Sequence, residues 1–111
     1  MGSKNRPRKI TDYETVFPCA GGVGILREEV WADEKGTVVR YNLAFVVPHR
    51  TRVDHGRILG YDNAHGRHER HFMGKAEAVE YKSFPSLARR FYREVEKLRK
   101  SYEGQGFHGW I

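Results

Sequence analysis

The sequence contains very little cysteine and no long hydrophobic segment. Cys19 is the only cysteine in 111 residues, which excludes an intrachain disulfide and a metal site built from cysteines alone. Neither a base nor a second cysteine lies near it in sequence, so we expect a small, semi-buried thiol. The longest apolar run, residues 43–47, is too short for a membrane span or a signal peptide. We therefore expect a cytoplasmic protein without a membrane partner.

Acidic residues are outnumbered by basic ones. The chain has 20 Lys and Arg against 14 Asp and Glu, a formal net charge of +6, and the excess gathers in residues 4–9 and 82–100. Clustered positive charge attracts polyanions and speeds encounter with them, although it specifies no sequence preference. We therefore expect a nucleic-acid partner, RNA in the first place, with ordinary solubility charge as the alternative.

The length suits one domain with one modest core. Residues 1–12 are polar, basic and interrupted by Pro7, so we expect a flexible arm with order beginning near Tyr13. Residues 13–102 form the expected single domain. Residues 103–111 contain too many glycines to continue a helix and form an expected Gly-rich tail.

Alternating apolar residues predict several strands. Residues 23–31 and 37–47 flank a polar turn that ends in glycine, which is typical of a hairpin. In the second of these strands the side chains expected to face the core are Val39, Tyr41, Leu43, Phe45 and Val47. Residues 57–61 and 75–81 are further expected strands.

The C-terminal third predicts one long amphipathic helix. Its apolar positions recur at alternating spacings of four and three, namely Phe84, Ala88, Phe91, Val95, Leu98 and Tyr102. Ser83 is suited to cap this helix and Pro85 to its first turn. The expected fold class is therefore α+β, an antiparallel sheet of about four strands with the C-terminal helix packed on one face.

Half of the six histidines fall within one predicted loop, residues 61–72. They are His65, His68 and His71. Neutral imidazoles can bind a transition metal, and two imidazoles in opposite protonation states can act as base and acid on a phosphodiester. A polar, pH-sensitive surface loop is a third interpretation.

The spacing of the histidines weighs against a metal. Gly66 and the turn chemistry of Asn63 disfavour a helix, and on a strand His68 and His71 would point to opposite faces. Arg67 and Arg70 add positive charge, which disfavours a divalent cation but suits a phosphate. We therefore expect neither a metal nor another cofactor.

These residues suggest an acid–base site. One of the three histidines would act as base and another as acid, with Asp62 orienting an imidazole and with Arg67 and Arg70 holding the phosphate. Four more arginines are expected to contact phosphates: Arg50 and Arg52 in the loop 48–56, and Arg89 and Arg93 on the helix.

The run Tyr61-Asp62-Asn63, followed by the three histidines, an apolar strand, Ser83-Phe84 and an amphipathic helix, resembles the TumE-like family of small prokaryotic toxins. The resemblance covers roughly residues 23–102, and the Tyr-Asp-Asn and His/Arg signature is its specific part. It implies a cytoplasmic toxin that a cognate antitoxin neutralises. It carries no catalytic assignment to individual residues.

The leading hypothesis is a toxin of a toxin–antitoxin pair that acts as a small, metal-independent ribonuclease. Its partners would be RNA and the antitoxin, with a homodimer as a further prospect. The alternative is a non-catalytic RNA- or DNA-binding module, or a toxin that acts through protein contact. Both hypotheses use the same basic residues, and only the first requires proton transfer.

Overall fold

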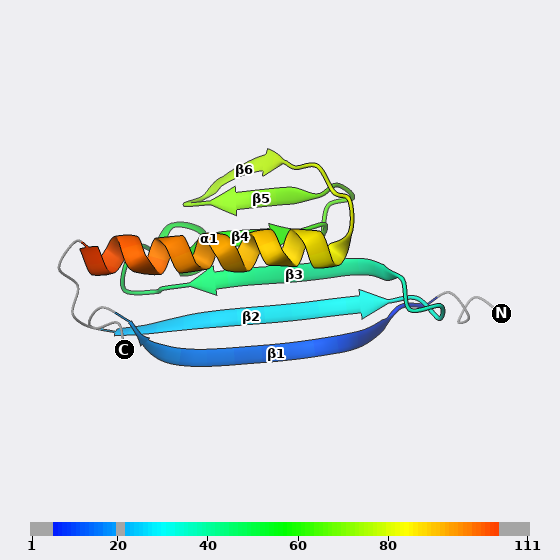
Figure 1. The fold of residues 1–111 in the computed structure, drawn as a ribbon, viewed down its shortest axis with the longest axis horizontal. Coiled ribbons are helices and arrows are strands. Elements are labelled where there is room, and N and C mark those ends of the chain that lie inside the picture. The colour runs from blue at the N-terminus through cyan, green and yellow to red at the C-terminus, as the bar shows by residue number, and fades with distance from the viewer. Residues whose placement is uncertain (1–5, 20–21, 105–111) are drawn as a thin grey trace.

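Alternating side chains along residues 8–78 build one antiparallel sheet in the computed structural model, which describes residues 6–19 and 22–104 (Figure 1). The six strands follow chain order, and each pairs with the next, so the sheet is a meander. They are β1 (Arg8–Cys19), β2 (Gly22–Ala32), β3 (Val38–Val46), β4 (Arg57–Asp62), β5 (Glu69–Phe72) and β6 (Lys75–Ala78).

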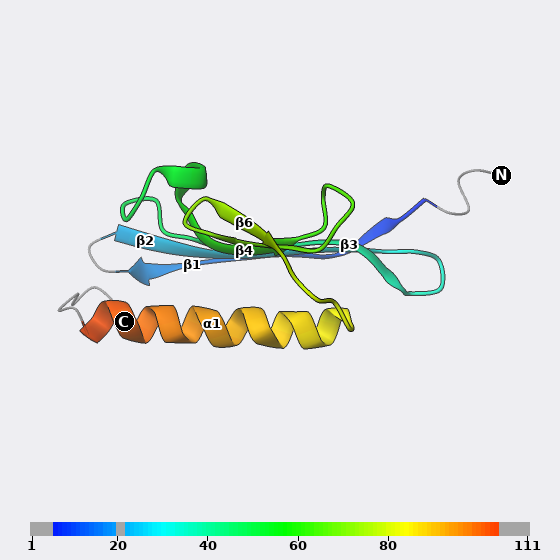
Figure 2. The same ribbon diagram turned by 90° about the horizontal axis from the view of Figure 1, so that it is seen from above.

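The predicted amphipathic helix is α1 (Phe84–Gly104), whose side chains are described to residue 100. Oγ of Ser83 accepts a hydrogen bond from the Ser86 N–H at 3.2 Å, which confirms Ser83 as its cap. The helix lies along one side of the sheet, across β3 and β4 (Figure 2). Between them lies the core, made of Tyr41, Leu43, Phe45, Leu59, Tyr61, Leu87, Phe91 and Val95 among others. The expected α+β arrangement is therefore confirmed.

We call the side of the sheet that α1 covers the helix face, and the other side the open face. The connection between β3 and β4, with its short 3₁₀ helix η2 (Val53–Gly56), and the connection between β4 and β5 rise above the open face in Figure 2. In the described part of the chain, no helix combines the length and apolar character needed to cross a membrane.

The sheet has six strands rather than the expected four or so. The two unexpected strands are β1, at one edge, and β5, next to the other edge. The edge strand β1 begins at Arg8 rather than near Tyr13, and residues 1–5 of the expected arm lie outside the described residues. Most β1 side chains are exposed, so this strand carries no apolar stripe that a sequence pattern could reveal. Val39, expected in the core, is 40% exposed, whereas Tyr41 in the same stripe is buried because Tyr81 and Phe84 pack against its ring.

At the other edge, residues 69–72 form β5 where a loop was expected, and β6 ends at Ala78 rather than continuing to Tyr81. Met73 and Gly74 connect the two strands with φ of 50° and 86°. Two positive φ values in a two-residue hairpin are typical of a type I′ turn, for which Asn-Gly is the usual signal. The expected Gly-rich tail is helical at residues 103 and 104, and 105–111 lie outside the described residues.

Candidate functional site

The three neighbours Tyr61, Asp62 and Asn63 have three different roles at the end of β4. Tyr61 is buried on the helix face, and its hydroxyl donates a hydrogen bond to Glu94 of α1. Asn63 holds the β3 backbone, because its side chain accepts from the Tyr41 N–H at 3.1 Å and donates to the Val39 carbonyl at 2.9 Å. These contacts fix the backbone on both sides of Asp62, whose carboxylate lies on the open face.

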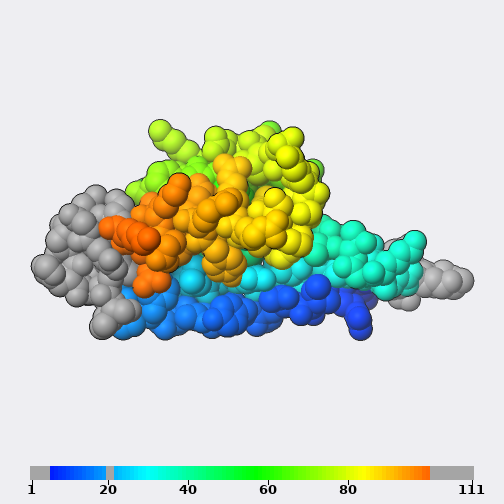
Figure 3. Space-filling model, viewed as in Figure 1, coloured from blue at the N-terminus to red at the C-terminus, as the bar shows by residue number. Residues whose placement is uncertain are grey.

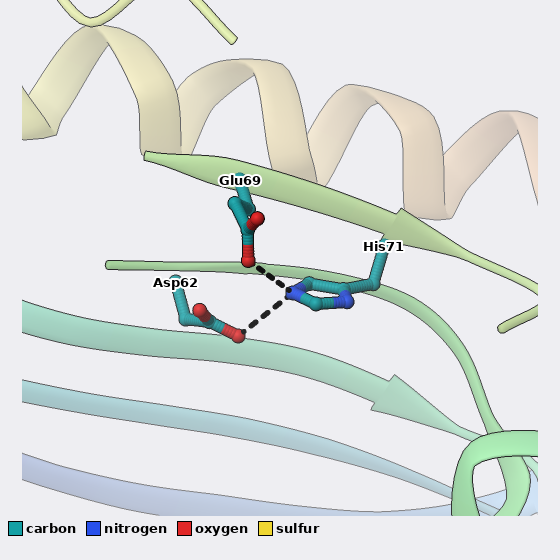
Figure 4. Close-up of side chains that lie close together, drawn as sticks. All are labelled: Asp62, Glu69 and His71. Carbon is teal, nitrogen blue, oxygen red and sulfur yellow. Dashed lines mark ion pairs between the residues drawn. The ribbon is translucent and has the colours of Figure 1, made fainter. Parts of the chain in front are cut away.

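Asp62 of β4 pairs directly with Glu69 of β5, and both are buried. Two like charges in directly opposite positions destabilise a sheet unless a cation compensates them. Nε2 of His71 lies between the carboxylates, 3.2 Å from Oδ2 of Asp62 and 3.6 Å from Oε1 of Glu69 (Figure 4). Nε2 is buried and has no hydrogen-bond partner among the described residues. The other ring nitrogen, Nδ1, points away from both carboxylates (Figure 4).

Two arginines contact the carboxylates of this Asp62–Glu69–His71 cluster. Nη1 of Arg57 lies 3.3 Å from Oδ2 of Asp62. Its side chain lies across Gly60, where a Cβ would be 2.8 Å from Cδ of Arg57, so the glycine makes room for it. Nε of Arg67 donates to Glu69 at 2.8 Å, and this hydrogen bond holds the pKa of Glu69 below its ordinary value.

The cluster lies one strand away from the edge of the sheet. Ala76 and Ala78 of the edge strand β6 pair with His71 and Glu69, and both alanines are exposed. Neighbouring strands are about 4.8 Å apart. Only small alanine side chains therefore lie between His71 and this edge of the sheet on the open face.

His68 lies on the opposite side of the sheet from His71. Its Nδ1 is 2.7 Å from the Tyr41 hydroxyl, and its ring stacks on Tyr81 with centroids 3.8 Å apart. These contacts place His68 on the helix face, outside the cluster. His65 is exposed in the turn before β5 and lies close enough to Glu69 to contribute to the lowered pKa of that carboxyl. The structure thus groups His71 and Asp62 and leaves His68 apart from them.

The arginines expected to bind phosphate are dispersed over the molecule. Arg70 is only 19% exposed on the helix face, where Nη2 lies 2.8 Å from Oε2 of Glu94 in a structural ion pair. Arg89 and Arg93 are exposed on α1, also on the side away from His71. Arg50 and Arg52 lie in the connection that carries η2, and Arg52 is exposed there. Of the expected set, Arg67 is the arginine that contacts the cluster.

The cluster also contains a set of possible metal ligands. This set differs from the three histidines that the sequence suggested as ligands. The ligand atoms of Asp62, Glu69 and His71 lie within 4.8 Å of one another, a spacing that a divalent cation could bridge. Arg67 pairs with Glu69, and Arg57 is shared between Asp62 and Asp54. This positive charge beside the cluster weakens its attraction for such an ion. Glu69 and Arg57 could not be recognised from the sequence, because only the β4–β5 register and the space above Gly60 bring them to Asp62.

Cys19 is fully buried on the helix face, more so than expected, and burial raises the pKa of its thiol. It lies outside the cluster.

A comparison of the chain with protein-family models, with curated proteins and with solved structures found no match in any of the three.

Proposed function

We propose that this chain is an RNA-cleaving protein of the toxin–antitoxin type whose reaction centre is the Asp62–Glu69–His71 cluster. The observation that carries the proposal is the position of Nε2 of His71 between two buried carboxylates. A carboxylate that faces one ring nitrogen orients the imidazole and stabilises the imidazolium formed when the other nitrogen accepts a proton. Nδ1 of His71 is then the atom that acts as the base.

The cleavage needs no metal in this mechanism. Nδ1 of His71 removes the proton of a ribose 2′-hydroxyl, whose oxygen attacks the adjacent phosphorus and forms a 2′,3′-cyclic phosphate. The bond to the 5′-oxygen breaks, and His65 in its imidazolium form protonates that leaving oxygen. Arg57 and Arg67, each about 3 Å from a carboxylate of the cluster, offset part of its negative charge and so reduce its repulsion of the phosphate.

The toxin role rests on the resemblance to TumE-like proteins. The Tyr61-Asp62-Asn63 run that carries the resemblance supports the proposal, because each of its members has a defined contact at the cluster or beneath it. We propose a cognate antitoxin as the protein partner, RNA as the substrate and the cytoplasm as the place of action.

A non-catalytic RNA-binding module is the second candidate. It is favoured by the charges on α1, where Arg89 and Arg93 are exposed and form no ion pair with any described residue. These arginines lie on the side of the sheet opposite His71. A protein that only binds RNA would use them and would leave the cluster as a structural element.

The test is cleavage of a fluorescent single-stranded RNA in EDTA by protein freed of contaminating nuclease. His71→Gln should lower the rate roughly a hundredfold or more, because it removes the base. His68→Gln, the same change on the opposite face, and His55→Gln, a change at an exposed histidine of η2, should keep the rate within a few fold. The DNA analogue should stay intact because it lacks the 2′-hydroxyl.

Three outcomes would contradict this mechanism. If His71→Gln cleaves RNA as fast as the unaltered chain, His71 is not the base. If EDTA abolishes cleavage, a metal held by the cluster replaces the proposed proton transfer. If the unaltered chain binds RNA without cleaving it, the binding module is the correct function.

A further inference from the structure

Most basic side chains on the sheet are already paired with a carboxylate. Such pairs include Lys9 with Glu29, Arg27 with Glu14, Arg57 with Asp62, Arg67 with Glu69, and Arg70 with Glu94. Lys82 and Arg93 differ, because neither side chain forms an ion pair or a hydrogen bond with a described residue. Near them, the guanidinium of Arg90 lies 5.5 Å from the centre of the Tyr61 ring. The chain therefore leaves a local excess of positive charge on the helix face.

These three cations line one pocket of about 190 Å³ at the start of α1. The pocket lies between the first turns of the helix and the segment that follows β6, on the side of the molecule shown in Figure 3. Its lining consists of Glu80, Lys82, Ser86, Leu87, Arg90 and Arg93. Pockets that enclose whole small molecules are larger, about 300–1,000 Å³. The size therefore suits a single small group rather than a whole nucleotide.

The lining has the chemistry of an anion site. Three cations face one carboxylate, and the Ser86 hydroxyl adds a donor. Arg90 and Arg93 are three residues apart on the helix, a spacing at which like charges destabilise each other. A bound anion would offset this repulsion, and a phosphate offers several oxygens to the guanidinium groups. We propose that this pocket, the Lys82 pocket, binds one phosphate group of an RNA strand.

The position of the pocket links it to the reaction centre. Glu80 and Lys82 follow the edge strand β6, and His71 lies on β5, the next strand inward, on the open face. An RNA strand held in the Lys82 pocket can pass around the edge at β6, over Ala76 and Ala78, toward His71. The inference rests on the proposed contact with RNA, and it does not require cleavage at His71.

The experiment measures RNA affinity by fluorescence anisotropy at several salt concentrations. The probe is a labelled single-stranded RNA of about twelve nucleotides, and EDTA is present. The test variant is Lys82→Ser with Arg93→Ser. The matched control is Lys97→Ser with Lys100→Ser. It also removes two positive charges, but from exposed positions of α1 outside the pocket. We expect the test variant to bind about tenfold or more weakly with a shallower salt dependence, and the control to change less than about threefold.

Equal losses of RNA affinity in the test variant and the control would overturn the proposal, because they would indicate a diffuse attraction of RNA to positive charge. Unchanged affinity in the test variant would also overturn it. Titration with inorganic phosphate distinguishes the source of the phosphate: if phosphate binds at this pocket and RNA fails to displace it, the ligand is a free phosphate and the RNA contact is wrong. A cleavage assay on His71→Gln tests the reaction centre separately, since that variant should still bind RNA through the Lys82 pocket.

Discussion

His68 and His71 lie on opposite faces of the sheet although only two residues separate them. His68 contacts Tyr41 on the helix face, and His71 contacts Asp62 on the open face. The cause is the alternation of side chains along the extended chain from His68 into β5. The two imidazoles therefore cannot act on the same phosphodiester, and they should respond differently to substitution.

His68 should contribute to stability rather than to chemistry. His68→Ala removes the stacking on Tyr81 and leaves the buried hydroxyl of Tyr41 without its partner. We expect the free energy of unfolding to fall by roughly 1–3 kcal/mol in urea titrations. His65→Ala, at an exposed turn position, should stay within about 0.5 kcal/mol of the unaltered chain. A larger effect for His65 than for His68 would reverse this assignment.

The contact between Arg67 and Glu69 should make stability depend on pH in the acid range. The hydrogen bond from Arg67 is the main cause that lowers the pKa of Glu69 below its ordinary value of 4.5. A lowered pKa stabilises the folded state above the unfolded value, and this contribution is lost as the pH falls through the folded pKa.

Arg67→Gln should therefore be less stable than the unaltered chain at pH 7, and the difference should narrow below about pH 4.5. Urea titrations at pH 7, 5, 4 and 3 measure it. Arg52→Gln is the control, because Arg52 is exposed and forms no ion pair with a described residue. The same difference at pH 3 as at pH 7 would show that Arg67 does not act through the Glu69 carboxylate.

Asparagine should suit position 73, in the turn between β5 and β6, better than the methionine present there. Met73 adopts φ of 50°, a conformation that costs most side chains about 1 kcal/mol and asparagine less. Met73→Asn should raise the free energy of unfolding by about 0.5–1 kcal/mol. Gly74→Ala should lower it by about 1–3 kcal/mol, because φ is 86° and the new Cβ would lie 2.3 Å from Cγ1 of Val53. Thermal melts of both variants decide this, and a stabilising Gly74→Ala would exclude the type I′ turn.

Arg70 and Glu94 should be coupled, as expected for an ion pair with side chains only 19% and 24% exposed. Glu94→Gln leaves Arg70 and the Tyr61 hydroxyl with a weaker acceptor, so we expect a loss of roughly 1–3 kcal/mol in stability. Adding Arg70→Met should cost less than the sum of the single changes by about 0.5–2 kcal/mol. Strict additivity in this double-mutant cycle would mean that Arg70 remains available for a phosphate.

Much of the fold could be predicted from local sequence, because the relevant signals repeat along the chain. The stripe that includes Phe91 and Val95 identified the helix, and the alternation that includes Leu43 and Phe45 identified β3 and its buried face. Both patterns arise because one face of each element meets the core. The exposed edge strand β1 carries no such pattern, and the β5–β6 turn is formed by Met73, a residue that does not signal positive φ.

The sequence by itself determined the helix, the central strands and the concentration of histidines in residues 65–71, since these depend only on residue type and spacing. The tertiary structure decided which of those histidines lies beside carboxylates, namely His71. Strand pairing places Glu69 opposite Asp62, and the alternation of β5 turns His71 toward both of them. Arg70 of β5 forms an ion pair with Glu94 of α1. Contacts between elements depend on the strand register and on the face of the sheet that α1 covers. The spacing of residues within a single segment specifies neither of these.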